Sequence, residues 1–176
     1  IDTGNGTTLI GAPGKDKFYL FSASGEAPVI TADGATISDD GDILAVVNGT
    51  KITVHLLPNL EVLWEEYVGQ GKDTVVSLSE DGMKMAISYP RSDANGIDSG
   101  MVTVYSYNVT DDDYYLVGDP IIGDAGDKLS SNTILAPDGK TLIVSSPGYN
   151  DGTGKVTVYR ETLQYDAIVG TVITWT

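Results

Sequence analysis

One loop of the sequence carries oxygen ligands at a spacing that suits a hard cation. Asp93, Asn95 and Asp98 surround Gly96, so carboxylate and amide oxygens can wrap around an ion such as Ca²⁺. The loop lacks the closing bidentate glutamate of a dedicated calcium loop, and Asp, Asn and Gly are also ordinary loop residues. It is therefore the best metal candidate in the chain, with a plain surface loop as the alternative.

Residues that support acid–base or nucleophilic catalysis are scarce. The chain holds a single histidine, His55, and no cysteine, which leaves little room for Ser-His-Asp, Cys-His or histidine-rich metal chemistry. Carboxylates are plentiful, so a glycosidase-type enzyme with its site on surface loops stays open as the less favoured alternative. No carboxylate pair stands out, and we expect a non-enzymatic protein.

Three Asn-x-Thr sequons, at Asn5, Asn48 and Asn108, are acceptor sites for N-glycosylation. All three fall at expected turns or loop edges, where a glycan stays in solvent. Because the chain has no cysteine, disulfides cannot indicate its cellular compartment, and the sequons are the evidence on its location. They favour an extracellular glycoprotein secreted from a eukaryotic cell.

The charge of the chain narrows its partners. The formal net charge is −15 with only ten Lys and Arg, whereas nucleic-acid binding needs clustered basic residues. No apolar run approaches the ~20 residues that span a bilayer. The chain starts at Ile1 rather than Met, which indicates a processed product or an excised segment. We expect neither a nucleic-acid partner nor a membrane span.

Four copies of one pattern follow one another through the chain, at roughly residues 1–30, 31–70, 71–123 and 124–176. Each has an Asp-Gly or Asn-Gly turn, a near-continuous apolar strand and then an alternating strand. Four antiparallel strands per copy are typical of a propeller blade. The sequence therefore predicts a single all-β domain, a β-propeller-like array of four blades, as a four-bladed ring or a segment of a larger propeller.

The alternating strand places equivalent residues of the four copies in columns. One column is apolar and consists of Leu20, Val54, Val104 and Val158. His55 falls in a second column, whose other members are the aromatic residues Phe21, Tyr105 and Tyr159. This position indicates that the only histidine is a structural blade residue.

Residues 114–160 carry the best match to a known repeat. The matching residues are Tyr115, Gly118, Ile122-Gly123, Gly126-Asp127, Asp138-Gly139, Pro147, Gly154 and Tyr159. This set resembles the FG-GAP repeat of integrin-α-type propellers, a resemblance that implies an extracellular propeller, often calcium-binding and adhesive. The spaced carboxylates of the family's calcium loop are missing from all the Asp-Gly turns, so that calcium site is not carried over.

The two ends of the chain differ from the inner repeats. Only Ile1 to Thr3 precede the turn of the first copy, so the pattern predicts that this copy lacks its first strand, while Val172, Ile173 and Trp175 extend the last copy. The C-terminal stretch could close a four-bladed ring, the chain could belong to a longer propeller, or a neighbouring chain could fill the open edge. These residues form the expected assembly edge.

Together these features predict a non-enzymatic extracellular module for structural assembly or adhesion, such as a subunit of a surface coat or filament. Its partners are then other protein chains, including further copies of itself. A calcium- or carbohydrate-binding propeller is the alternative, with Ca²⁺ as the only cofactor that the sequence suggests. That alternative would use Asp93 to Asp98 and an exposed Trp64 or Trp175.

Overall fold

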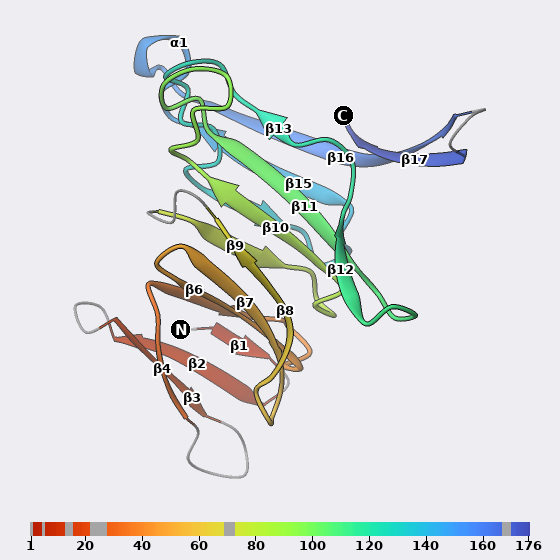
Figure 1. Cartoon of the computed structure of the whole chain (residues 1–176). Coiled ribbons are helices and arrows are strands. Elements are labelled where there is room, and N and C mark those ends of the chain that lie inside the picture. The colour runs from red at the N-terminus through yellow and green to blue at the C-terminus, as the bar shows by residue number, and fades with distance from the viewer. Residues whose placement is uncertain (1, 5, 13–15, 22–27, 69–72, 167–169) are drawn as a thin grey trace.

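The computed structural model describes the whole chain except residues 1, 5, 13–15, 22–27, 69–72 and 167–169. Four antiparallel sheets follow one another along the chain, which confirms the expected all-β, propeller-like architecture. The sheets lie in an open row from the N-terminus to the C-terminus (Figure 1). Blades 1 and 4 stand at opposite ends of that row, so the arrangement is an open propeller segment rather than a four-bladed ring.

Blades 1 and 2 each consist of four strands in chain order. Blade 1 contains β1 (Asp2–Gly4), β2 (Thr7–Ala12), β3 (Lys17–Phe21) and β4 (Val29–Thr31). Blade 2 contains β5 (Gly34–Ile37), β6 (Ile43–Asn48), β7 (Lys51–Leu56) and β8 (Glu61–Tyr67).

Blades 3 and 4 carry the longer connections. Blade 3 contains β9 (Val75–Leu78), β10 (Lys84–Tyr89), β11 (Met101–Asn108) and β12 (Asp113–Leu116), and the short β13 (Ile121–Ile122) also pairs with β11. Blade 4 contains β14 (Thr133–Leu135), β15 (Thr141–Ser146), β16 (Lys155–Asp166) and β17 (Gly170–Trp175), with a single turn, α1 (Tyr149–Gly152), before β16.

Apolar side chains fill the space between consecutive blades. Successive residues of a strand point to opposite faces of its sheet, so one strand supplies two cores. In β6, Leu44 and Val46 pack toward blade 1, whereas Ala45 and Val47 pack toward blade 3. This double burial explains why the strand reads as an uninterrupted apolar run.

The Asp-Gly turns are linked from blade to blade. Ser38 Oγ donates to Asp40 Oδ1 at 2.6 Å, and Ser79 Oγ donates to Asp81 Oδ1 at 2.7 Å. The Asp40 amide donates to the Glu80 carbonyl at 3.0 Å, and the Glu80 amide donates to the Pro137 carbonyl at the same distance. The turns thus shape their own hairpins and also join blades 2, 3 and 4.

The structure corrects one expectation about the ends of the chain and excludes one of the three alternatives for the C-terminal stretch. Blade 1 has its own first strand, because β1 pairs with β2 through three residues, as short as β14 in blade 4. The C-terminal strand β17 does not pair into blade 1. It is the fourth strand of blade 4 and pairs with the long β16.

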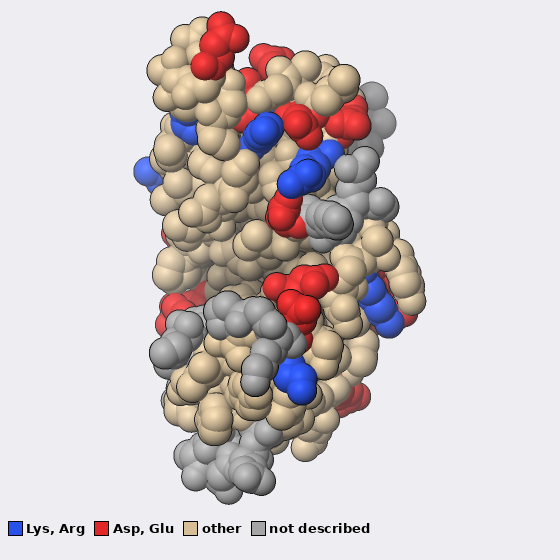
Figure 2. Space-filling view, turned by 90° about the vertical axis from the view of Figure 1, so that its left-hand side faces the viewer, with Lys and Arg blue, Asp and Glu red and all other residues tan. Residues whose placement is uncertain are grey.

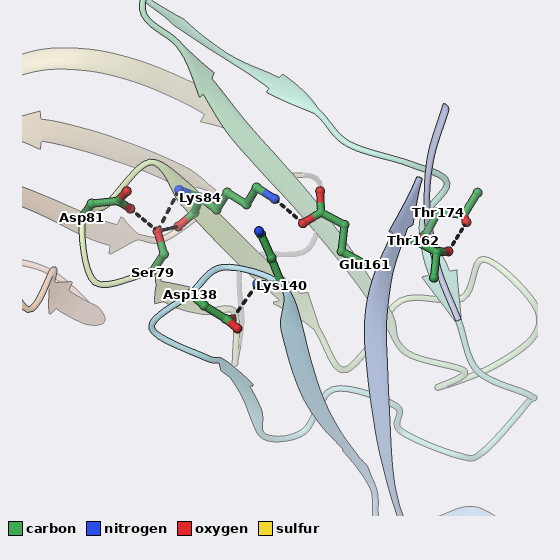
Figure 3. A network of polar contacts seen from close by, with 8 residues as sticks. All are labelled: Ser79, Asp81, Lys84, Asp138, Lys140, Glu161, Thr162 and Thr174. Carbon is green, nitrogen blue, oxygen red and sulfur yellow. Dashed lines mark hydrogen bonds and ion pairs between the residues drawn. The ribbon is translucent and has the colours of Figure 1, made fainter. Parts of the chain in front are cut away.

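An ion pair joins blades 3 and 4 at the edge of their shared core (Figure 3). Lys84 Nζ lies 2.6 Å from Glu161 Oε2, and the two side chains are only 17% and 8% exposed. Charges this deeply buried depend on each other, because either one alone would be desolvated without compensation.

Replacing one partner of this pair should therefore destabilise the protein. We expect Glu161→Ala to lower the free energy of unfolding by about 2–3 kcal/mol, because Lys84 is left buried and unpaired. The paired change Lys84→Met with Glu161→Leu should restore most of the loss. Urea unfolding followed by circular dichroism measures both effects.

The control is the exposed ion pair of Lys51 and Glu65, 2.7 Å apart on the surface of blade 2. Glu65→Ala should leave the urea midpoint unchanged, because solvent screens exposed pairs. A double variant as unstable as Glu161→Ala would show that the destabilisation comes from lost packing and not from the unpaired charge.

Candidate functional site

The apolar column of the third strands shows how the blades meet. Cross-strand pairing places Leu20, Val54 and Val104 on the side of each sheet that faces the next blade. Their exposed fractions are 4%, 0% and 2%, because the next blade covers them. Val158 occupies the same position in blade 4 and is 50% exposed. The last blade thus carries the side chains of an inter-blade core without a blade to cover them.

The neighbours of Val158 extend this uncovered surface. Ile143 lies directly opposite Val158 on β15, and Ile134 lies opposite Ile143 on β14, so the three form one row across the sheet. Val156 lies two residues before Val158 on the same side. All four are exposed, and we call them the blade 4 face: Ile134, Ile143, Val156 and Val158.

Blade 1 has a corresponding face at the other end of the row, on which no other described blade lies (Figure 1). Ile10, Tyr19, Phe21 and Val29 share the side of the sheet that points away from blade 2, and we call them the blade 1 face. Phe21 is 45% exposed. Its equivalents Tyr105 and Tyr159 pack into the cores formed with the preceding blades.

A cavity of about 710 Å³ lies between the inner strands β5 and β9. Small and apolar residues line it, with Asp33 and Asp73 at its polar side. Asp33 accepts the Gly49 amide at 2.6 Å, and Asp73 accepts Arg91 Nε at 2.6 Å. Both carboxylates are thus engaged in holding neighbouring loops.

Aromatic residues cluster between blades 2 and 3. The Trp64 ring lies 5.1 Å from that of Tyr105, and Tyr105 donates to Glu66 Oε2 at 2.8 Å. Burial, followed by the Glu66 interaction, raises the pKa of Tyr105, and burial raises the pKa of Tyr89 to about 12. These phenols stay protonated at neutral pH and pack or donate hydrogen bonds.

The expectation that two tryptophans are exposed is wrong. Trp64 packs against the core between blades 2 and 3, and Trp175 packs against the core between blades 3 and 4. Both are half-buried. Neither ring is presented as a flat platform for a sugar.

The loop of Asp93, Asn95 and Asp98 is held by its own hydrogen bonds. Asp93 Oδ1 accepts the Asp98 amide at 2.8 Å, and Asn95 Nδ2 donates to the Gly123 carbonyl at 3.1 Å. In the part of the chain that the structure describes, no three His, Cys, Asp or Glu side chains gather to hold a metal ion. The cation site stays a prediction from the sequence.

Close backbone contact explains the glycine that ends this loop. Gly100 has a φ of +77°, and a Cβ there would collide with the Leu129 backbone. Only glycine tolerates both constraints, and the contact joins the Asp93 loop to the segment before β14. The loop is thus anchored on two sides, by Gly100 and by Asn95.

Two of the three sequons can be placed. Asn48 ends β6 and Asn108 ends β11, and both are exposed at hairpin turns. Asn48 Nδ2 donates to the Thr31 carbonyl at 3.3 Å and Asn108 Nδ2 to Asp111 at 2.7 Å, contacts near the surface. Asn5 lies outside the described residues.

His55 occupies the column expected for it. It pairs with Leu44, as Tyr105 pairs with Met85 and Tyr159 with Leu142. Its Nε2 lies 2.8 Å from Thr53 Oγ1, and its Nδ1 lies 3.2 Å from the Leu60 carbonyl. The half-buried ring is therefore engaged within blade 2.

The residues of the expected assembly edge fall in different places. Thr3 lies in β1, opposite Thr8, while Ile1 lies outside the described residues. Val172, Ile173 and Trp175 lie in β17, opposite residues of β16. The structure thus places these residues on strands at the two ends of the row, and sequence reasoning did not find the sheet faces beside them.

The face of the molecule drawn in Figure 2 carries side chains of both charges. Figure 2 shows acidic and basic side chains scattered among uncharged ones, without a continuous basic patch among the described residues of this face. Among the described residues, no helix is long and apolar enough to cross a membrane.

Comparisons with known proteins identify the fold. No protein-family model and no curated protein matches the sequence. A protein of Bacteroides uniformis named as a candidate 6-phosphogluconolactonase has a TM-score of 0.63 at 14% identity, over 100% of this chain and 52% of that one. Hsv2 of Kluyveromyces lactis has a TM-score of 0.61 at 14% identity, over 99% of this chain and 59% of that one.

The β-propeller domain of Cps50 (Swd1) from Myceliophthora thermophila has a TM-score of 0.55 at 13% identity, over 98% of this chain and 56% of that one. The chain has a β-propeller fold and spans between half and three fifths of the length of these structures. At this identity the similarity extends to the fold alone. The resemblance to FG-GAP repeats stays a prediction from the sequence.

Identical substitutions in one column test whether the blade 4 face is uncovered. We expect Val104→Ala to lower the free energy of unfolding by about 2 kcal/mol, because two buried methyl groups are lost. Val158→Ala should change it by less than about 0.5 kcal/mol in dilute protein, since Val158 already contacts water. Equal losses in urea unfolding would mean that Val158 is covered within the chain.

Proposed function

We propose that this protein is a non-enzymatic, secreted module that acts by assembly, and that its terminal blade faces are its binding surfaces. The observation that carries the proposal is the exposure of Val158 and Ile143, whose equivalents fill the core at every inner blade contact. Apolar faces that elsewhere form cores are typical of surfaces that another sheet covers.

The geometry of the faces supports assembly rather than the capture of a small ligand. The blade 4 face is a row of β-branched side chains on a sheet, and such a row packs against another sheet at about 10 Å. Its four defining residues are all Ile or Val, whereas small-molecule sites share a few convergent polar groups. A protein surface of the blade type fits it best.

The polar side chains of the chain support the non-enzymatic part of the proposal. His55 is engaged by Thr53 and Leu60, and the two carboxylates of the inner cavity are engaged by Gly49 and Arg91. The buried tyrosines have raised pKa values and remain neutral at physiological pH. These groups are committed to holding the blades and loops.

The exposed sequons support secretion. Asn48 and Asn108 lie at hairpin turns away from the terminal faces, so glycans there would leave the assembly surfaces open. A strongly acidic, glycosylated surface with uncovered end faces suits a subunit of an extracellular assembly, where chains associate at high local concentration.

The native particle mass tests the assembly function. Undenatured protein from its source should scatter light as a particle heavier than the 18.6 kDa chain, because its end faces are covered by partners. After unfolding in denaturant, the same sample should fall to chain mass plus glycan. A native particle with the mass of one chain and its glycans would contradict the proposal.

Peptide mass spectrometry tests secretion separately. In protein from the native source, the peptides that contain Asn48 and Asn108 should carry glycans that peptide-N-glycosidase removes. In a secreting eukaryotic host, Thr50→Ala and Thr110→Ala should each abolish one glycan and leave the other in place. Unmodified asparagines in the native protein would count against a secretory origin.

A further inference from the structure

We infer that the partner at both terminal faces is a second copy of this chain, with the blade 4 face of one copy packed on the blade 1 face of the other. This inference rests on the proposed assembly function and names its partner. The contact is head-to-tail, because two different faces meet.

The chain itself carries both halves of such a contact. At the contacts of blade 2 with blade 3 and of blade 3 with blade 4, the apolar column of one blade meets residues of the next blade that include Tyr105 or Tyr159. Val158 continues the first set, after Leu20, Val54 and Val104. Phe21 continues the second set, together with Ile10 and Tyr19 beside it on the blade 1 face.

The two faces also match in the kind of side chain that they present. The blade 4 face is built from Ile and Val, and the blade 1 face adds the rings of Tyr19 and Phe21. The core between blades 2 and 3 combines the same types, with Val54 and Ala45 from one blade and Tyr105 from the other. A copy-to-copy contact would therefore repeat a packing that the chain already makes.

Size supports two copies in particular. Matched propeller structures are covered to 52%, 59% and 56% of their length by one copy, so two copies supply about the material of one such structure. Two rows of four blades give eight blades, which lies within the usual range of about four to eight for a closed propeller. A heterologous contact that closes in this way ends as a ring and leaves no free face.

Light scattering on the purified chain measures this contact directly. The recombinant protein should run as a species of about 37 kDa, twice the mass of one chain, and should dissociate on dilution. Val158→Lys and Phe21→Lys should each weaken the pairing about 30-fold or more, because a charge is placed in an apolar contact. The control, Val62→Lys, alters a residue that is 52% exposed on β8 of blade 2 and should leave pairing unchanged.

Mixing the two variants tests the head-to-tail geometry. Val158→Lys retains an intact blade 1 face, and Phe21→Lys retains an intact blade 4 face, so an equimolar mixture should form mixed pairs through one undamaged contact. A pair formed by two copies of the same variant has no undamaged contact. Circular dichroism of each variant confirms that a loss of pairing is not a loss of folding.

Three results would overturn the inference. The first is a wild-type chain that stays at 18.6 kDa at every concentration. The second is a pair that only Val158→Lys disrupts, which would mean that like faces meet. The third is a mixture that fails to pair. A monomeric recombinant chain together with a heavier native particle would refute the second copy and leave the assembly function standing, with another protein on the faces.

Discussion

The structure depends on burial of apolar side chains between consecutive sheets. A blade of four strands has two faces, and a sheet of this size is stable only when an apolar face is covered. Residues of β6 and β10 therefore alternate between two cores, as Leu44 and Ala45 do. The apolar strands, the turn ladder and the buried ion pair all follow from this stacking.

The same requirement for covered apolar faces explains why the two end blades differ from the inner blades. Each inner blade has a neighbouring blade on both of its faces, whereas blades 1 and 4 each have a neighbouring blade on one face only (Figure 1). Repeat arrays commonly end in a unit with a polar outer face. Here Ile143 and Val158 keep the apolar character of the inner blades on the outer face of blade 4, as expected of a face that a further sheet covers.

Much of this was predictable from the sequence, because a period of two survives in every repeat. The column of Val104 and Val158 and the position of His55 follow directly from that period. The terminal strands did not follow, because β1 has only three residues and β16, with twelve, is longer than the third strand of any other blade. Exposure of Val158 could not be read from its type, since Val54 and Val158 are the same residue in the same column.

The apolar columns of the four blades are too similar to determine which blade packs on which. Polar side chains determine the order of the blades instead. Lys84 lies two residues before Ala86 on the side that faces blade 4, and Glu161 meets it there. The equivalent position in blade 2 is Ile43 and in blade 4 is Thr141, so a mismatched contact would bury one charge unpaired. The ion pair thus favours the correct order of blades along the row, while the apolar faces between the blades stabilise the fold.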